Sequence, residues 1–131
     1  IAAAKGVAVR RLISRKSDFR ILVDIGRAFY GDLRRAGVAI HEYTRAMNHA
    51  KLAVADGRWV LAGSANLDAR SMNLNFEVGI LARAPELGDR LGTHIDRLFA
   101  EAVPIDPQRF ARRSTWQRLK QGALRLWAPL L

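Results

Sequence analysis

Two short clusters of polar residues in the middle of the chain have the types and spacing to act on a phosphate. His49 and Lys51 are separated by one residue, and after a turn the chain reads Gly-Ser-Ala-Asn at 63–66. Lys51 offers a compact positive charge, while the Ser64 hydroxyl and the Asn66 amide can donate to phosphate oxygens. The His49 imidazole can attack phosphorus or exchange a proton with a leaving alcohol near neutral pH. The pattern predicts chemistry on a phosphodiester.

A β-hairpin is expected to bring the two clusters together. Two apolar stretches flank Asp56 and Gly57, a dipeptide that strongly favours a two-residue hairpin loop. With that loop, counting outward along two strands places Ser64 directly across from His49. Cross-strand Cβ atoms lie roughly 4.5 to 5.5 Å apart, so the polar groups would converge on a patch about the size of one phosphate. Asp56 would lie at the far end of the hairpin, in a structural role.

The rest of the chain alternates between strand and helix patterns, which predicts an α/β fold. Asp18 is a plausible helix N-cap, and apolar residues then recur at helical spacing until Gly37. Pro85 suits the first turn of another helix. The predicted strands cover 7–13, 38–43, 49–55, 58–63 and 75–82, and the predicted helices cover 19–36, 85–102 and much of the tail.

Composition limits the classes of partner. The chain has 131 residues, half of them hydrophobic, which is enough for one small core. Its net charge of +10 favours nucleic acid, anionic lipid or a phosphate-bearing substrate, although a basic surface can also serve solvation alone. Without cysteine, disulfides and thiolate metal sites are excluded. No run of about 18 apolar residues predicts a membrane span, and no signal peptide is visible.

The two clusters resemble a known signature. His49-x-Lys51-x4-Asp56 followed by Gly63-Ser64-x-Asn66 resembles the HKD motif of the phospholipase D superfamily. The resemblance covers almost the whole chain, and its details are similar to the C-terminal half of the bacterial cardiolipin synthases of that superfamily. The segments that carry it outside the motif read YGDLRRAGVAIHEY, LNFEVG and STWQRLKQGALRLWAPLL.

The resemblance implies a fold and an incomplete active site. Members form an α/β/α sandwich with a mixed β-sheet, in which two HKD halves meet about a pseudo-twofold axis and each supplies one histidine. One histidine becomes a phosphohistidine, and the other acts as acid and base. Because this chain has one motif, it would supply one half, and a missing N-terminal HKD half or a second copy would supply the other.

The resemblance also implies residue roles. His49 would be the general acid that protonates the leaving alcohol, and Glu77 would accept a hydrogen bond from its imidazole. No metal or cofactor is required. The implied catalytic residues are His49, Lys51 and Glu77; the implied phosphate-binding residues are Lys51, Ser64 and Asn66; the implied structural residues of the motif are Asp56 and Gly63.

Two domains are expected. Residues 1–103 would be the second HKD domain, truncated at its N-terminus because the chain opens in the middle of an αβ unit. Residues 104–131 would form a basic amphipathic helix that lies on an anionic bilayer or, alternatively, packs on the domain. Its apolar side chains at near-helical spacing are Trp116, Leu119, Ala123, Leu126 and Trp127.

The expected activity is phosphatidyl transfer through a phosphohistidine intermediate, with phosphatidylglycerol as the anionic phospholipid. The expected location is the bacterial cytoplasmic membrane, peripheral on the cytoplasmic side or anchored by an upstream segment. A hydrolytic phospholipase D is the near alternative. A homodimeric endonuclease and an inactive lipid-binding remnant are disfavoured, and nucleic acid is an unlikely partner, because few residues precede His49, the tail carries tryptophan, and all the motif residues are present.

Overall fold

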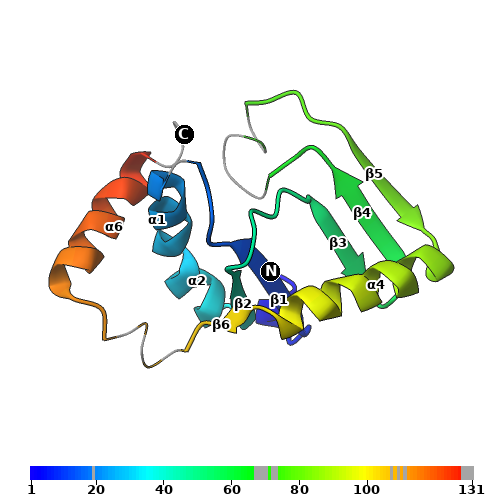
Figure 1. The fold of residues 1–131 in the computed structure, drawn as a ribbon, viewed down its shortest axis with the longest axis horizontal. Coiled ribbons are helices and arrows are strands. Elements are labelled where there is room, and N and C mark those ends of the chain that lie inside the picture. The colour runs from blue at the N-terminus through cyan, green and yellow to red at the C-terminus, as the bar shows by residue number, and fades with distance from the viewer. Residues whose placement is uncertain are drawn as a thin grey trace. The chain divides into compact units, whose positions relative to one another are not determined.

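The computed structural model describes residues 1–18, 20–66, 71, 74–106, 108, 110 and 112–127. The chain forms two compact units. The first holds residues 1–48 together with the C-terminal segment that begins at Glu101, and the second holds residues 49–100. Each unit combines helices with a three-stranded sheet, which confirms the α/β class (Figure 1).

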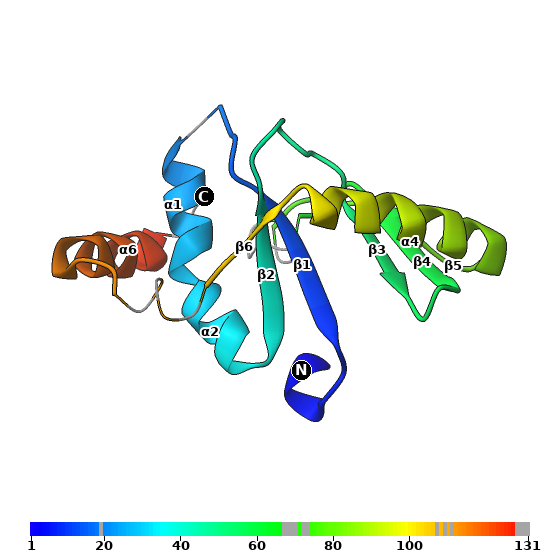
Figure 2. The ribbon, with the colours of Figure 1, turned by 60° about the horizontal axis from the view of Figure 1, so that its bottom comes forward.

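The first unit is built on a mixed sheet. Strands β1 (Val9–Ser14) and β2 (Val38–Tyr43) pair in parallel, and β6 (Val103–Pro104) pairs antiparallel to β2. Helices α1 (Arg20–Ala28) and α2 (Tyr30–Arg35) connect the parallel strands, as a parallel pair requires (Figure 2). A short 3₁₀ helix, η1, precedes β1 at residues 3–5.

The single helix expected between Asp18 and Gly37 is two helices. Phe29 lies in a turn, and its N–H donates to the Gly26 carbonyl at 3.2 Å, an i→i−3 bond that tightens the end of α1. Gly37 ends the pair as expected, with φ of +90°. A Cβ at Gly37 would lie 3.2 Å from the Ala3 carbonyl oxygen, so both backbone angle and space favour glycine there.

A buried ion pair ties the two helices to the sheet of the first unit. Glu42 on β2 is only 4% exposed, and Arg27 on α1 donates to both of its carboxylate oxygens at 2.7 Å. The Tyr30 hydroxyl donates to the same carboxylate at 3.2 Å. Burial favours the neutral acid, but the hydrogen bonds and charge of Arg27 outweigh it and lower the pKa of Glu42. Burial and the Glu42 charge raise the pKa of Tyr30.

Helix α6 (Thr115–Trp127) packs beside α1 within the first unit (Figure 1). Lys120 donates to the Asp24 carboxylate at 2.6 Å, and Leu124 is half-buried. Trp116 and Leu119 are nevertheless 75% and 63% exposed. The tail therefore packs on the domain and also leaves apolar side chains uncovered. Leu126 and Trp127 were expected to belong to the same apolar stripe, but their side chains are not among those that the structure describes.

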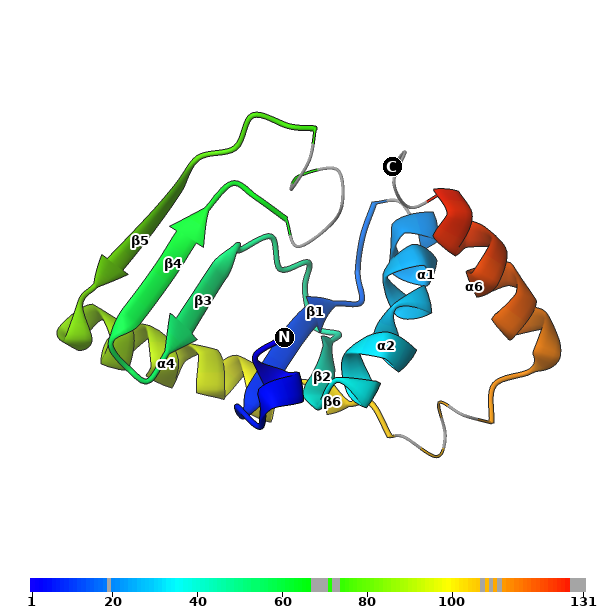
Figure 3. The ribbon, with the colours of Figure 1, turned by 180° about the vertical axis from the view of Figure 1, so that it is seen from behind.

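The described part of the second unit contains an antiparallel sheet with a helix packed against it. Strands β3 (Leu52–Ala55), β4 (Trp59–Gly63) and β5 (Gly79–Arg83) pair in that order. Helix α4 (Pro85–Ala100) runs across one face of this sheet (Figure 3). It begins at Pro85, as predicted. No helix in the described part of the chain is long and apolar enough to cross a membrane.

The turn of the hairpin is as expected, but the register is not. Asp56 and Gly57 both have positive φ, at 52° and 63°, and the Arg58 N–H closes the turn on the Ala55 carbonyl at 3.1 Å. The strand ladder, however, begins with Ala55 opposite Trp59. Arg58 is thus an extra residue on one strand, a bulge that displaces the pairing by one position. The prediction that Ser64 lies directly across from His49 is wrong for this reason.

Candidate active site

His49 and Lys51 contact one another directly before strand β3. They were expected within the strand, but β3 begins at Leu52. The Lys51 Nζ lies 2.9 Å from His49 Nδ1 and donates to the His49 carbonyl oxygen at 2.8 Å. A lysine ammonium has no lone pair, so Nδ1 must be the acceptor in this arrangement. Nε2 of the exposed imidazole is therefore the nitrogen left for a substrate.

Ser64 is bonded to the segment before β5. Its N–H donates to the Val78 carbonyl at 2.9 Å, and its Oγ accepts from the Val78 N–H at 3.0 Å. The same hydroxyl donates to Glu77 Oε2 at 2.5 Å. With the corrected register, the partner of Lys51 is Gly63, whose N–H donates to the Lys51 carbonyl at 3.1 Å. Ser64 is thus held by Glu77 and Val78.

Three side-chain hydrogen bonds hold Glu77 in its ionised form. Those from Ser64 and Ser71 lower its pKa most; partial burial opposes them, and Asn75 and the positive charge of Lys51 lower it further. Asn75 donates to Oε1 at 3.3 Å. Glu77 was expected inside a strand, but it precedes β5 and is half-exposed.

The contacts of the His49 imidazole differ from those that were expected. The resemblance implies that His49 donates to Glu77, yet no hydrogen bond joins these two residues in the part of the chain that the structure describes. Lys51 holds the imidazole instead. The two groups remain linked through Lys51, whose charge also acts on Glu77.

The space around position 63 requires a residue without a side chain. A Cβ built on Gly63 would lie 2.5 Å from the Val78 carbonyl oxygen and 2.8 Å from the Gly79 Cα, far inside ordinary contact distances. The glycine lets β4 and β5 approach closely at the point where Ser64 begins. Asp56 lies in the hairpin turn, as expected for a structural residue. Asn66 is exposed two residues beyond Ser64.

Two supporting residues were not found from the sequence. Ser71 is buried and its hydroxyl helps hold Glu77, as does the amide of Asn75. The sequence does not indicate that either side chain contacts Glu77, so only the fold reveals this role. Within the described residues, no group of three or more His, Cys, Asp or Glu side chains could hold a metal ion.

The arrangement provides the elements of phosphoryl chemistry. The Lys51 ammonium has three donors, of which two reach His49, so the third is open to a phosphate oxygen. The ionised Glu77 and the Ser64 hydroxyl supply a negative group and a hydrogen-bonding group in the same unit.

Comparison with known proteins agrees with this chemistry. Residues 1–99 match the family model described as cardiolipin synthase, phospholipase D-like domain. The chain is 35% identical over 131 residues to a cardiolipin synthase of Geobacillus thermodenitrificans and 34% identical over 130 residues to cardiolipin synthase A of Erwinia tasmaniensis. These alignments cover 100% and 99% of this chain but only 26% and 27% of the relatives, so the chain spans about a quarter of their length.

The family match covers most of the chain, and the relatives align with all or nearly all of it, including both parts of the motif. The chain belongs to the phospholipase D-like domain family of the cardiolipin synthases.

Proposed function

We propose that this chain supplies the second HKD half of a phosphatidyltransferase that makes cardiolipin. The observation that carries the proposal is identity of 35% over all 131 residues to a cardiolipin synthase, together with an intact motif. Residues 1–103 act as the HKD domain. Two phosphatidylglycerol molecules are the substrates, and cardiolipin and glycerol are the products.

In the proposed mechanism His49 moves protons. A histidine of the first HKD half attacks the phosphorus of one phosphatidylglycerol, the bond to its terminal glycerol breaks, and His49 protonates the departing oxygen. The hydroxyl of a second phosphatidylglycerol then attacks the phosphorus of the phosphatidyl-histidine while His49 takes its proton, and the phosphorus–nitrogen bond breaks to release the first histidine. Lys51, Ser64 and Asn66 hold the phosphate oxygens and stabilise their charge as it develops.

Glu77 acts through its neighbours in this scheme. Its hydrogen bond from Ser64 sets the position of that hydroxyl. When substrate draws Lys51 away from the imidazole, Nδ1 becomes free to donate to the carboxylate. The hydrogen bond expected between His49 and Glu77 is thus proposed for the substrate-bound enzyme.

The uncovered face of the β3–β4–β5 sheet supports a partner half. Leu61 on β4 pairs with Leu81 on β5, and both are exposed, as is Trp59 on the same face. Helix α4 contacts β3 and β4 on the opposite face, where Val60 is buried. Because the relatives are much longer than this chain, we propose that the other HKD half covers this face and completes the α/β/α sandwich. A second copy of the chain is the alternative partner.

The exposed stripe of α6 supports a membrane location. Trp116, Leu119 and Ala123 recur at intervals of three and four residues, and all three are exposed. Such a stripe on a basic amphipathic helix suits the surface of an anionic bilayer. We propose that α6 lies on the cytoplasmic membrane of a bacterium, on its cytoplasmic side.

The test uses the full-length protein with vesicles that contain phosphatidylglycerol. We expect cardiolipin and glycerol by mass spectrometry, at least about 1,000-fold less of both with His49→Ala, and unchanged amounts with His94→Ala, a control on the exposed surface of α4. Phosphatidic acid as the only product would assign hydrolysis instead. Absence of any lipid product, combined with nicking of plasmid DNA, would overturn the lipid assignment.

A further inference from the structure

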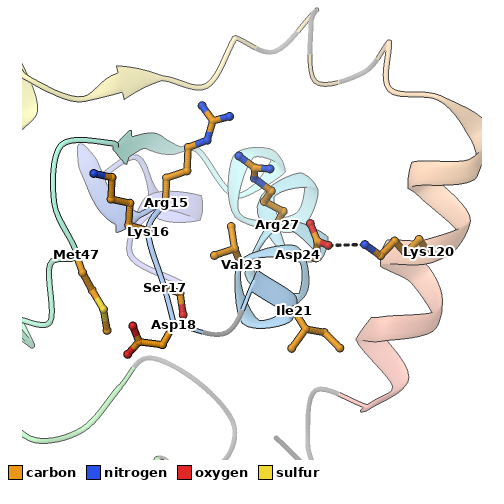
Figure 4. A pocket seen from close by; sticks show the side chains of 10 residues that line it. All are labelled: Arg15, Lys16, Ser17, Asp18, Ile21, Val23, Asp24, Arg27, Met47 and Lys120. Atoms are coloured by element: carbon orange, nitrogen blue, oxygen red, sulfur yellow. Dashed lines mark hydrogen bonds and ion pairs between the residues drawn. The ribbon is translucent and has the colours of Figure 1, made fainter.

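The first unit contains a cavity with a basic wall that has no part in the chemistry described above. Its volume is about 900 Å³, within the range of small-molecule sites. Four cationic and two acidic side chains line it together with apolar ones (Figure 4). The charged lining residues are Arg15, Lys16, Arg27, Lys120, Asp18 and Asp24.

Two of the four cations are already neutralised by carboxylates of the same unit. Arg27 forms its two-bond pair with Glu42, and Lys120 is bonded to Asp24 at 2.6 Å. These pairs fix the wall of the cavity but leave little charge to attract a ligand.

Arg15 and Lys16 supply the remaining positive charge. The Arg15 side chain is 57% exposed and lies 3.9 Å from Glu42, a carboxylate that Arg27 already engages more closely. Lys16 donates to the Arg45 carbonyl oxygen at 2.7 Å, which leaves two ammonium donors. Figure 4 places Asp18 on the side of the cavity away from Arg15. An anion at the basic wall would therefore avoid that carboxylate.

The loop that presents these two cations is held in place by hydrogen bonds. The Ser14 hydroxyl donates to the Lys16 carbonyl at 2.8 Å and accepts from the Asn48 N–H at 3.2 Å. With the bond from Lys16 to Arg45, the two loops that follow β1 and β2 are fixed to each other. A site whose donors are positioned in advance loses less entropy when its ligand binds.

We propose that this cavity binds the phosphate group of a phosphate ester, with Arg15 and Lys16 as its ligands. Both side chains suit phosphate, since guanidinium groups bind it in a two-pronged geometry and ammonium groups as point charges. The cavity is much larger than one phosphate, and Ile21, Val23 and Met47 add apolar lining. The organic part of the ester would occupy that remaining space.

The identity of the ester rests on the proposed function. Cardiolipin carries two phosphate groups, and the HKD residues account for one. The phosphate of the second phosphatidylglycerol is the group that this cavity would hold.

The test measures binding in the full-length protein carrying Lys51→Ala, which weakens the phosphate site of the HKD residues. Calorimetric titration uses three probes: inorganic phosphate, glycerophosphoglycerol, and phosphatidylglycerol vesicles with phosphatidylcholine vesicles as reference. The variant is Arg15→Gln with Lys16→Gln. The control is Lys5→Gln with Arg112→Gln, two exposed cations of the same unit that do not line the cavity.

We expect the Arg15 and Lys16 variant to bind glycerophosphoglycerol and phosphatidylglycerol vesicles at least about tenfold more weakly than the control. An equal loss of affinity for inorganic phosphate would show that a free phosphate group is sufficient for binding. A loss of affinity for the vesicles and glycerophosphoglycerol alone would assign the site to the lipid headgroup. Equal binding by variant and control would overturn the proposal. Cardiolipin formation is followed separately, so a protein that binds through Arg15 and Lys16 without making cardiolipin would contradict only the proposed function.

Discussion

Gly63 shows how a single missing side chain positions the candidate site. Its α-carbon faces the Val78 carbonyl. Ser64, which follows Gly63, and Glu77, which precedes Val78, share a hydrogen bond of 2.5 Å. Any side chain at position 63 would push the two strand ends apart. The glycine of the motif is thus explained by packing between β4 and β5, with no special backbone angle involved.

Replacing Gly63 with alanine should therefore cost stability and activity together. We expect Gly63→Ala to reduce the free energy of unfolding by about 1–3 kcal/mol, because the added Cβ overpacks against Val78. The rate of cardiolipin formation should fall by more than this loss of folded protein explains, because Glu77 moves with Val78. Thermal unfolding and the lipid assay on the full-length protein measure the two effects.

Gly92 provides the matched control for this substitution. It lies in α4, and a Cβ there would meet nothing within 4 Å. Gly92→Ala should raise helix stability by about 0.5–1 kcal/mol and leave activity unchanged. If Gly63→Ala behaves like Gly92→Ala, the packing argument for the motif glycine is wrong.

The residue types at the site could be predicted from the sequence better than their contacts. The spacing of His49, Lys51 and Ser64 was sufficient to indicate phosphate chemistry. The direct contact of Ser64 with Glu77 was not foreseen, because it depends on the register of β4 with β5, which no local pattern sets across the long connection between them. The residue across the hairpin from Ser64 was missed because no local pattern marks the bulge at Arg58. A shift of one residue in a hairpin changes every cross-strand neighbour.

At the scale of elements, the buried Glu42 connects α1, α2 and β2. Arg27 and Tyr30 reach this carboxylate from two different helices, so one side chain fixes how both pack on the sheet. Apolar periodicity, which is a local pattern, predicted that five of the strands and α4 exist, but β3 and β5 begin later than predicted and the first helix is divided in two. The Glu42 cluster could not be predicted, because it joins residues that are 12 and 15 positions apart through tertiary packing.

Removal of this carboxylate should weaken the first unit strongly. We expect Glu42→Gln to lower the free energy of unfolding by about 3 kcal/mol, because Arg27 would keep a partly buried charge without its partner. The control is Asp32→Asn, which breaks an exposed pair with Arg35 and should cost under about 1 kcal/mol. Denaturant unfolding at pH 7 measures the difference.

The difference in stability between wild type and Glu42→Gln should depend on pH. The pKa of Glu42 is lowered in the folded state from its ordinary value of 4.5. The carboxylate therefore contributes stability that is fully present above pH 4.5 and is lost as pH falls through the folded pKa. The gap in stability between wild type and Glu42→Gln should narrow only below that pH, and a constant gap down to pH 3 would contradict the assignment.

At the scale of the whole molecule, helix α4 contacts β3 and β4 on one face of the β3–β4–β5 sheet, and large apolar side chains are exposed on the other face. Side chains alternate along a strand, so Val60 faces α4 while Leu61 and its partner Leu81 face away from it. Leu81 is 68% exposed on the edge strand. Apolar residues gathered on an uncovered face commonly mark an interface. The chain spans about a quarter of the length of the relatives it matches.

If the other HKD half covers this face in the full-length protein, a charge at Leu81 would be buried without a partner. We expect Leu81→Asp to reduce the free energy of unfolding by about 3 kcal/mol or more, whereas Leu87→Asp, at an exposed position of α4, should cost under about 1 kcal/mol. The chain contains no cysteine, so Leu81→Cys and Leu87→Cys also allow thiol labelling of each site followed by peptide mapping. Slow labelling at position 81 and fast labelling at position 87 would place the partner half on this face. Equal labelling rates, together with equal small losses of stability for the two aspartate variants, would show that the face stays open and that the second histidine must reach the site by another route.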